Sequence, residues 1–220
     1  MELGVMVSAL VDGLGLSAWI FVVTLVGSLP LGIVVALCRM SSFKPLSLLA
    51  QFYISILRGT PLMLQLMAFM FGPYYLLGMN MGTDWKFGAC AVGFILNYSA
   101  YFAEIYRSGI QSIPKGQYEA ALVLGYSRSQ TFFKIVLPQV IKRILPAMGN
   151  EIITLVKDTS LARIIALQEI IWAGQAFMKG SHGISGAIWP LFFTAVYYLI
   201  FNGILTVLLG RLEKKLEYFR

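Results

Sequence analysis

EAALVLGYSRSQTFFKIVLP, residues 119–138, is a polar and partly basic stretch that lies between apolar segments long enough to cross a membrane. It opens with good helix formers, but a glycine inside a helix costs about 1 kcal/mol relative to alanine, so we expect a short helix to end in a turn at Gly125. Ser127 is suited to cap a second short helix, and Pro138 is expected to interrupt the backbone again. Two short helices joined by a glycine turn predict a small docking element on a membrane surface.

The rest of the chain has the composition of an integral membrane protein. Of its 220 residues, 58% are apolar and 12% are charged, whereas soluble domains carry about 25% charged residues. Several charge-free runs are long enough to span a bilayer. The basic residues that give the net charge of +7 are scattered over loops between these runs. This distribution indicates membrane topology and contact with anionic lipid rather than nucleic acid.

We therefore predict an all-α integral membrane protein with one transmembrane domain, residues 1–220. The expected spans are residues 14–38, 52–73, 87–113, 144–165 and 186–210, with a cytoplasmic loop at residues 114–138. The apolar stretch 45–78 is too long for one straight span, so its start is expected to lie along the membrane interface. Cys38 and Cys90 lie within apolar segments and are expected to be small buried side chains, not a disulfide or a metal site.

Several motifs resemble those of the permease subunits of bacterial ATP-binding-cassette importers. Glu119-Ala120-Ala121, Gly125, Ile135 and Leu137-Pro138 occur at the spacing of the "EAA" loop of that family. Two further stretches are similar to its polar amino-acid branch: Arg58-Gly59-Thr60-Pro61, and Asn97-Tyr98-Ser99-Ala100-Tyr101 continuing through Glu104 to Arg107 and Gly109. The resemblance implies the type I importer permease fold, with about five transmembrane helices and a cytoplasmic coupling helix.

The resemblance also implies partners and roles. Two ATPase subunits, a second permease subunit that is identical or related, and an extracytoplasmic amino-acid-binding protein are expected. Glu119, Ala120, Ala121 and Gly125 would couple the chain to an ATPase. No G-x-x-x-x-G-K-[ST] phosphate loop occurs in the sequence, so ATP would be hydrolysed by the partner and this chain would need no cofactor. The resemblance thus implies a multi-pass protein of the cell membrane.

Polar residues within the spans are candidates for substrate contacts. Residues 97, 101, 104 and 108 share one helix face, and residues 150, 151, 154 and 158 share another. A buried carboxylate costs about 2.5–3.5 kcal/mol on insertion scales, so Glu104 needs a partner, a cavity, or both. Structural alternatives remain: Arg58 as a snorkelling charge, Glu104 paired with Arg107 or Arg58, and Asp158 paired with Lys157 at a helix end. The candidate substrate contacts are Glu104, Asp158, Asn97, Tyr101, Arg58 and Thr60.

An amino acid carries a carboxylate, which could meet Arg58, and an ammonium, which could meet Glu104 or Asp158. Two carboxylates in the membrane favour a basic side chain over a glutamine-like one, although specificity could reside in the binding protein. Basic residues are denser in the loops that would be cytoplasmic, which predicts an amino terminus outside and a carboxyl terminus inside. The main alternative is a self-contained secondary transporter or channel that uses Glu104 and Asp158 for ion coupling. A membrane enzyme is weaker, because the single histidine, His182, suggests neither a catalyst nor a metal site.

Overall fold

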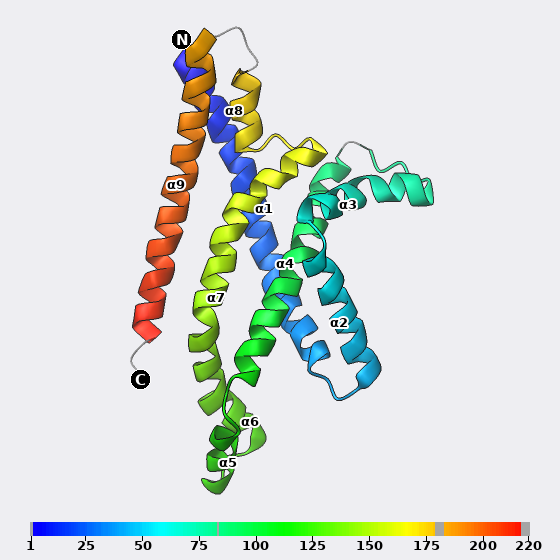
Figure 1. Ribbon diagram of the computed structural model, residues 1–220, viewed down its shortest axis with the longest axis vertical. Helices are drawn as coiled ribbons and strands as arrows, with labels where there is room; N and C mark the ends of the chain where they lie inside the picture. Colours follow the sequence, from blue (N-terminus) through cyan, green and yellow to red (C-terminus); the bar gives the residue numbers. More distant parts are fainter. Residues whose placement is uncertain (1, 83, 179–182, 217–220) are drawn as a thin grey trace.

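The computed structural model describes residues 2–82, 84–178 and 183–216, and these residues form helices and short connections. His182 lies outside the described residues. A π-helical turn, Thr131–Val136, precedes the α-helix Leu137–Asp158, and a 3₁₀ helix, Thr159–Ile165, follows it. The α-helices are α1 Glu2–Arg39, α2 Lys44–Gly59, α3 Leu62–Leu77, α4 Trp85–Gln111, α5 Lys115–Val123, α6 Arg128–Gln130, α7 Leu137–Asp158, α8 Ile170–Met178 and α9 Gly183–Leu216 (Figure 1).

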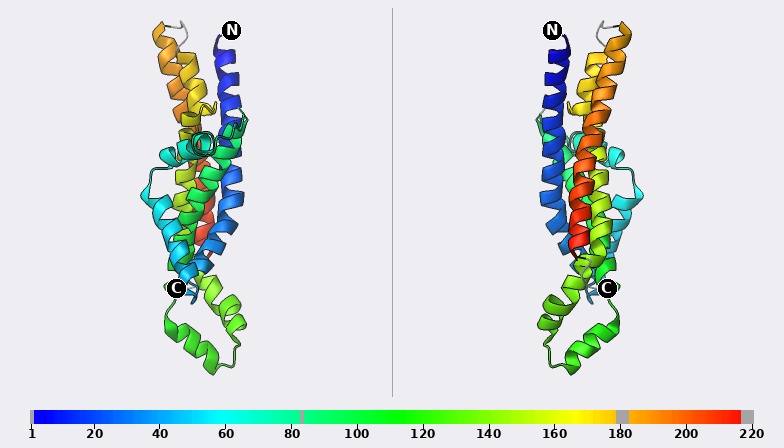
Figure 2. Two further views of the ribbon diagram at one scale, coloured as in Figure 1. Left: turned by 90° about the vertical axis from the view of Figure 1, so that its right-hand side faces the viewer. Right: turned by 90° about the vertical axis from the view of Figure 1, so that its left-hand side faces the viewer.

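The long helices run along one axis of the molecule. In Figure 1, α1, α4, α7 and α9 extend along the vertical direction, while α3 turns away to the side. The short helices α5 and α6 project beyond one end of the bundle, and both views of Figure 2 show this projection clearly. Helix α1 begins at the opposite end of the molecule. This projecting end contains much of the stretch 119–138 and is the most protruding part of the described chain.

The hydropathy of the helices agrees with a membrane protein, but it is uneven. Among the described residues, Leu10–Arg39 and Ile188–Leu216 are long and apolar enough to cross a membrane, and the bent pair α2 and α3 also qualifies if it is taken as one span. Helices α4 and α7 fall short because they carry more polar residues. Polar transmembrane helices are normally shielded from lipid by their neighbours, and α4 is packed between α1, α2, α3 and α7.

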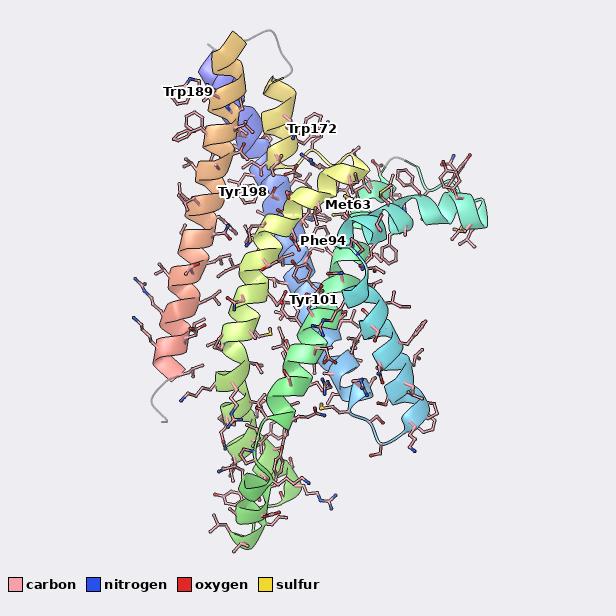
Figure 3. All side chains as sticks on the ribbon, in the orientation of Figure 1. Met63, Phe94, Tyr101, Trp172, Trp189 and Tyr198 are labelled. Atoms are coloured by element: carbon pink, nitrogen blue, oxygen red, sulfur yellow. The ribbon has the colours of Figure 1, made fainter. Side chains whose placement is uncertain are left out.

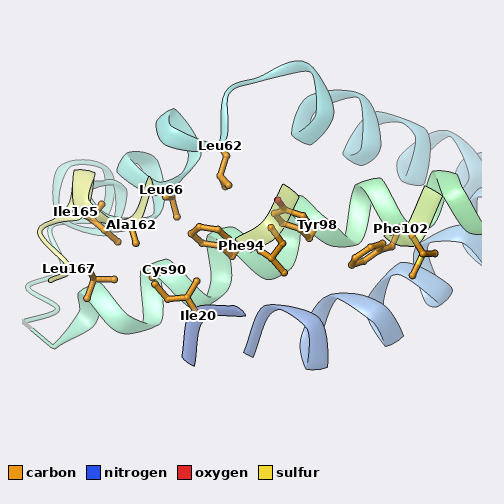
Figure 4. Close-up of a cluster of buried hydrophobic side chains, with 12 residues drawn as sticks. Ile20, Leu62, Leu66, Cys90, Phe94, Tyr98, Phe102, Ala162, Ile165 and Leu167 are labelled. Atoms are coloured by element: carbon orange, nitrogen blue, oxygen red, sulfur yellow. The ribbon is translucent and has the colours of Figure 1, made fainter. Parts of the chain in front are cut away.

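The core forms around α4. Phe94, Tyr98 and Phe102 are buried on this helix and pack with apolar side chains from α1, α3 and α7 (Figure 4). On α1, a Cβ atom added at Gly32 would lie 2.9 Å from Cβ of Phe102, and one added at Gly27 would lie 2.6 Å from Cδ1 of Ile95. Small residues let two helix backbones approach closely in a membrane. The two glycines thus determine how tightly α1 packs against α4.

Two expected spans differ from the helices observed. The stretch 52–73 is not one helix: α2 and α3 are bent by 107° at the break between Gly59 and Leu62, because Pro61 cannot donate the backbone hydrogen bond that a continuous helix needs. The stretch 144–165 is α7 only as far as Asp158 and continues as the 3₁₀ helix, ending at Ala166 with a left-handed φ of 59°. Both breaks lie beside one cavity, whose lining includes Pro61 and Asp158.

Candidate functional site

A polar cavity of about 530 Å³ lies between the α2–α3 break, α4 and the end of α7. Cavities of this size hold small molecules in many proteins. A second hollow, between α1, α8, α9 and the end of α7, measures only about 20 Å³ and is lined mostly by apolar side chains. The polar cavity is lined by Arg58, Gly59, Thr60, Pro61, Leu62, Asn97, Tyr98, Tyr101, Glu151, Thr154, Asp158 and Leu161.

One cation and two carboxylates line this cavity. The guanidinium of Arg58 lies over the ring of Tyr101, 5.1 Å from its centre, in a cation–π contact; Figure 3 shows Tyr101 on α4, between α2 and α7. Next to Tyr101 on α4, with ring centres 6.2 Å apart, the hydroxyl of Tyr98 donates a hydrogen bond of 2.7 Å to Oδ2 of Asp158 at the end of α7. Glu151 lies two helical turns before Asp158 and is half-buried. The cavity therefore carries a formal excess of one negative charge when all three groups are ionised.

Five of the six candidate substrate residues meet at the cavity: Arg58, Thr60, Asn97, Tyr101 and Asp158. The sixth, Glu104, is not among the lining residues. Its carboxylate pairs with Arg107 at 2.6 Å, and Arg107 also donates to Oε1 of Gln111. Glu104 therefore pairs with one of the two arginines expected from the sequence, three residues further along its own helix.

The substrate contacts predicted from the sequence did not include Glu151, although the spacing of polar residues on its helix indicated it. Glu151, Thr154 and Asp158 follow each other at intervals of three and four residues, which places them on one face of a helix, and all three line the cavity. Tyr98 was also omitted as a site residue. Its partner, Asp158, is 60 residues away in the sequence, so no local pattern identifies it.

The turn and the cap of the protruding element, residues 115–130, have the local structure that their sequence predicts. After α5, Gly125 adopts a left-handed φ of 80°, its N–H donates to the carbonyl of Leu122, and the N–H of Tyr126 donates to that of Ala121. These two bonds form the Schellman motif that ends many helices. Ser127 and Gln130 then form a reciprocal capping box that starts α6.

The expected interruption at Pro138 was wrong. The helical path continues from α6 through the π-helical turn into α7, with Pro138 in the first turn of α7. A proline ring normally clashes with the carbonyl four residues earlier, here that of Lys134, which belongs to the wider π-helical turn. The tip of the element exposes Leu122, Val123 and Leu124, with 59%, 88% and 73% of their surfaces accessible. Glu119 and Ala120 are also exposed, whereas Ala121 is buried.

Comparison with known proteins gives consistent matches over nearly the whole chain. Residues 28–218 match the family model described as "Binding-protein-dependent transport system inner membrane component". The arginine transport system permease protein ArtQ of Bacillus subtilis is 38% identical over 208 residues, which cover 94% of this chain and 92% of that protein. The glutamine transport system permease protein GlnP of Escherichia coli K12 is 35% identical over 211 residues, covering 94% of this chain and 93% of GlnP.

Solved structures agree with the sequence comparisons. A chain of an amino acid ABC transporter crystallised with histidines has a TM-score of 0.84 and 31% identity, with coverage of 95% of this chain and 94% of that one. A chain of the MetNI methionine ABC transporter, in an inward-facing conformation, has a TM-score of 0.68 at 17% identity. The likeness to the MetNI chain concerns the fold alone, whereas the likeness to the amino acid ABC transporter chain extends to related sequence.

Proposed function

This chain belongs to the family of binding-protein-dependent transport system inner membrane components, and from this membership we propose that it forms the translocation pathway of an ATP-driven amino-acid uptake system. The observation that carries the proposal is the cavity of about 530 Å³ with Arg58, Glu151 and Asp158 in its wall. Charged groups at membrane depth are costly and occur chiefly along substrate and ion pathways. A polar amino acid delivered by a binding protein would enter this cavity.

The charges of the cavity favour a basic amino acid. The carboxylate of the substrate would pair with Arg58 and its ammonium with one of the two carboxylates, because ionised groups form the stronger hydrogen bonds in proteins. This pairing leaves one carboxylate, Glu151 or Asp158, for a cationic side chain. The preference now rests on Glu151 and Asp158 rather than on Glu104, which is paired with Arg107.

The energy source is proposed to be a pair of separate ATPase subunits. Helix α5 and its exposed tip, residues 122–124, would dock in a cleft of one ATPase, with Glu119, Ala120 and Gly125 in or beside the contact. A second permease subunit, identical or related, would face this one. Closure of the ATPase pair on ATP would then shift the two permeases between inward-open and outward-open states. A self-contained secondary transporter would give no role to this protruding element.

The orientation follows from the distribution of charge. In the proposed orientation the cytoplasmic side carries α5 and α6, and the amino terminus of α1 lies outside. Arg39, Lys44, Lys115 and Arg143 belong to segments that would then be cytoplasmic. An excess of lysine and arginine in short cytoplasmic loops is the usual signal of membrane topology.

The test is uptake of L-arginine and L-glutamine by proteoliposomes that contain the permease, its ATPase and the binding protein. We expect uptake to require ATP, and we expect Asp158→Asn to weaken L-arginine binding to the permease–ATPase complex by tenfold or more, since hydrogen bonds to charged groups contribute about 1.5–3 kcal/mol. Asp12→Asn, at an exposed position on α1, is the matched control. Gradient-driven uptake by the chain alone, without ATPase, would refute the proposal.

A further inference from the structure

The break between α2 and α3 leaves backbone carbonyls without their usual partners. In a continuous helix the carbonyl of Leu57 would accept a hydrogen bond from the N–H of residue 61, but residue 61 is a proline and has none. The carbonyl of Thr60 likewise loses its partner, because the N–H of Leu64 donates to Pro61 instead. Unsatisfied carbonyls within a membrane are costly, because lipid offers no hydrogen-bond donor. The bend must therefore be stabilised by other donors.

Two buried amide side chains supply those donors. Nε2 of Gln65 lies 2.9 Å from the Leu57 carbonyl, 3.1 Å from the Thr60 carbonyl and 2.8 Å from the Thr60 hydroxyl. Nδ2 of Asn97, on α4, donates to the same Leu57 carbonyl at 3.0 Å and to Oε1 of Gln65 at 3.0 Å. Gln65 and Asn97 are only 7% and 4% exposed. These bonds tie the broken helix to α4.

The residues at the break form part of the cavity wall. Arg58, Gly59, Thr60 and Pro61 all belong to its wall, whereas Gln65 does not. If α2 and α3 formed one straight helix, the backbone at residues 58–61 would follow another path. Arg58 and Thr60 would then point in a different direction relative to Asp158. Arg58 is the one cation that the described residues place in that wall, and its position thus depends on a side chain outside the lining.

We propose that Gln65 is a positioning residue for substrate: by satisfying the carbonyls freed at Pro61, it fixes the 107° bend that presents Arg58 and Thr60 to the cavity. This inference rests on the proposed function of the cavity. Asn97 both lines the cavity and completes the network, so Gln65 is the residue whose replacement isolates the effect of the bend.

The experiment uses the complete permease–ATPase complex in lipid nanodiscs, with L-arginine and L-glutamine as probes of binding. Gln65→Met retains the length of the side chain and removes its amide. Gln51→Met, an exposed glutamine on α2, is the control. We expect Gln65→Met to weaken binding by about tenfold or more, which corresponds to about 1.4 kcal/mol, because Arg58 and Thr60 would no longer be held in the cavity wall. We expect Gln51→Met to bind as the original chain does.

A double variant separates positioning from mere stability. In Gln65→Met/Pro61→Ala, residue 61 regains an N–H that can reach the Leu57 carbonyl, so the helix no longer needs the amide. We expect this variant to recover the thermal stability that Gln65→Met loses but not the substrate affinity. Recovery of both would overturn the proposal, because Gln65 would then serve the fold alone. The double variant also gives an answer if Gln65→Met fails to fold.

The bend itself can be measured with spin labels on two exposed residues, Leu48 on α2 and Leu76 on α3, after replacement of the native cysteines. With a rise of 1.5 Å per residue, the two backbone positions are about 25 Å apart across the bend and about 40 Å apart in a straight helix. We expect a longer or broader distribution in both Gln65 variants, and an unchanged distance would refute the inference. Binding that is lost in Asp158→Asn but retained in Gln65→Met would refute this inference alone, whereas retention in both would refute the cavity as the substrate site.

Discussion

Replacement of Gly13 by alanine should loosen the contact between α1 and α8. A Cβ atom added at this glycine would lie 2.8 Å from Cα of Ile170, 2.9 Å from its nitrogen and 3.0 Å from the carbonyl carbon of Glu169. All three are backbone atoms, so no side-chain rotation relieves the overlap. Helix α8 would have to move away from α1. This movement would disrupt the buried hydrogen bond that the N–H of Ile170 donates to Oγ of Ser17.

Gly15 provides a matched control two residues further along α1, because a Cβ there would have nothing within 4 Å. Both replacements gain up to about 1 kcal/mol of helix propensity. Only Gly13→Ala incurs the cost of overpacking, about 1–3 kcal/mol. The difference between the two variants should therefore be about 2 kcal/mol, which corresponds to about 4–8 °C in melting temperature for a chain of this length.

The assay is thermal unfolding of the purified chain in nanodiscs, with the two variants measured side by side. We expect Gly15→Ala to melt at or slightly above the temperature of the original chain, and Gly13→Ala to melt below it. Equal melting temperatures for the two variants would refute the close backbone approach of α1 and α8 on which the prediction depends.

Three further outcomes follow from local contacts. Glu169→Ala should destabilise the chain by about 1–3 kcal/mol in the same assay, since the buried carboxylate accepts hydrogen bonds from the N–H groups of Ile171 and Trp172; a loss no larger than that of an exposed substitution would contradict this role. Ser127→Ala removes an exposed capping box and should cost about 0.5–2 kcal/mol locally, detectable as faster amide hydrogen exchange in α6; unchanged exchange would argue against the cap. Glu119→Lys should leave membrane insertion and stability intact, because Glu119 is exposed, but should uncouple ATP hydrolysis from uptake in proteoliposomes. Normal uptake by Glu119→Lys would count against docking of α5.

Much of the fold follows from local chemistry in the sequence. The length and apolarity of the runs near residues 14–38 and 186–210 identify two helices that could cross a membrane, because hydropathy depends only on composition. The turn at Gly125 and the cap at Ser127 are equally local: a left-handed backbone favours glycine, and a serine oxygen reaches the N–H three residues ahead. The interruption predicted at Pro138 was wrong, because whether a proline breaks a helix depends on the width of the preceding turn.

The tertiary structure alone decided which polar groups meet. The spacing of Glu104 and of Asp158 put each on a polar face of its own helix, yet only Asp158 lines the cavity and Glu104 pairs with Arg107. Helical periodicity fixes the direction of a side chain around its own helix axis, but not which neighbouring helix it faces or at what depth. The bend at Pro61 has the same origin: the proline permits it, while Asn97, from a helix that begins more than twenty residues later, helps to set its direction.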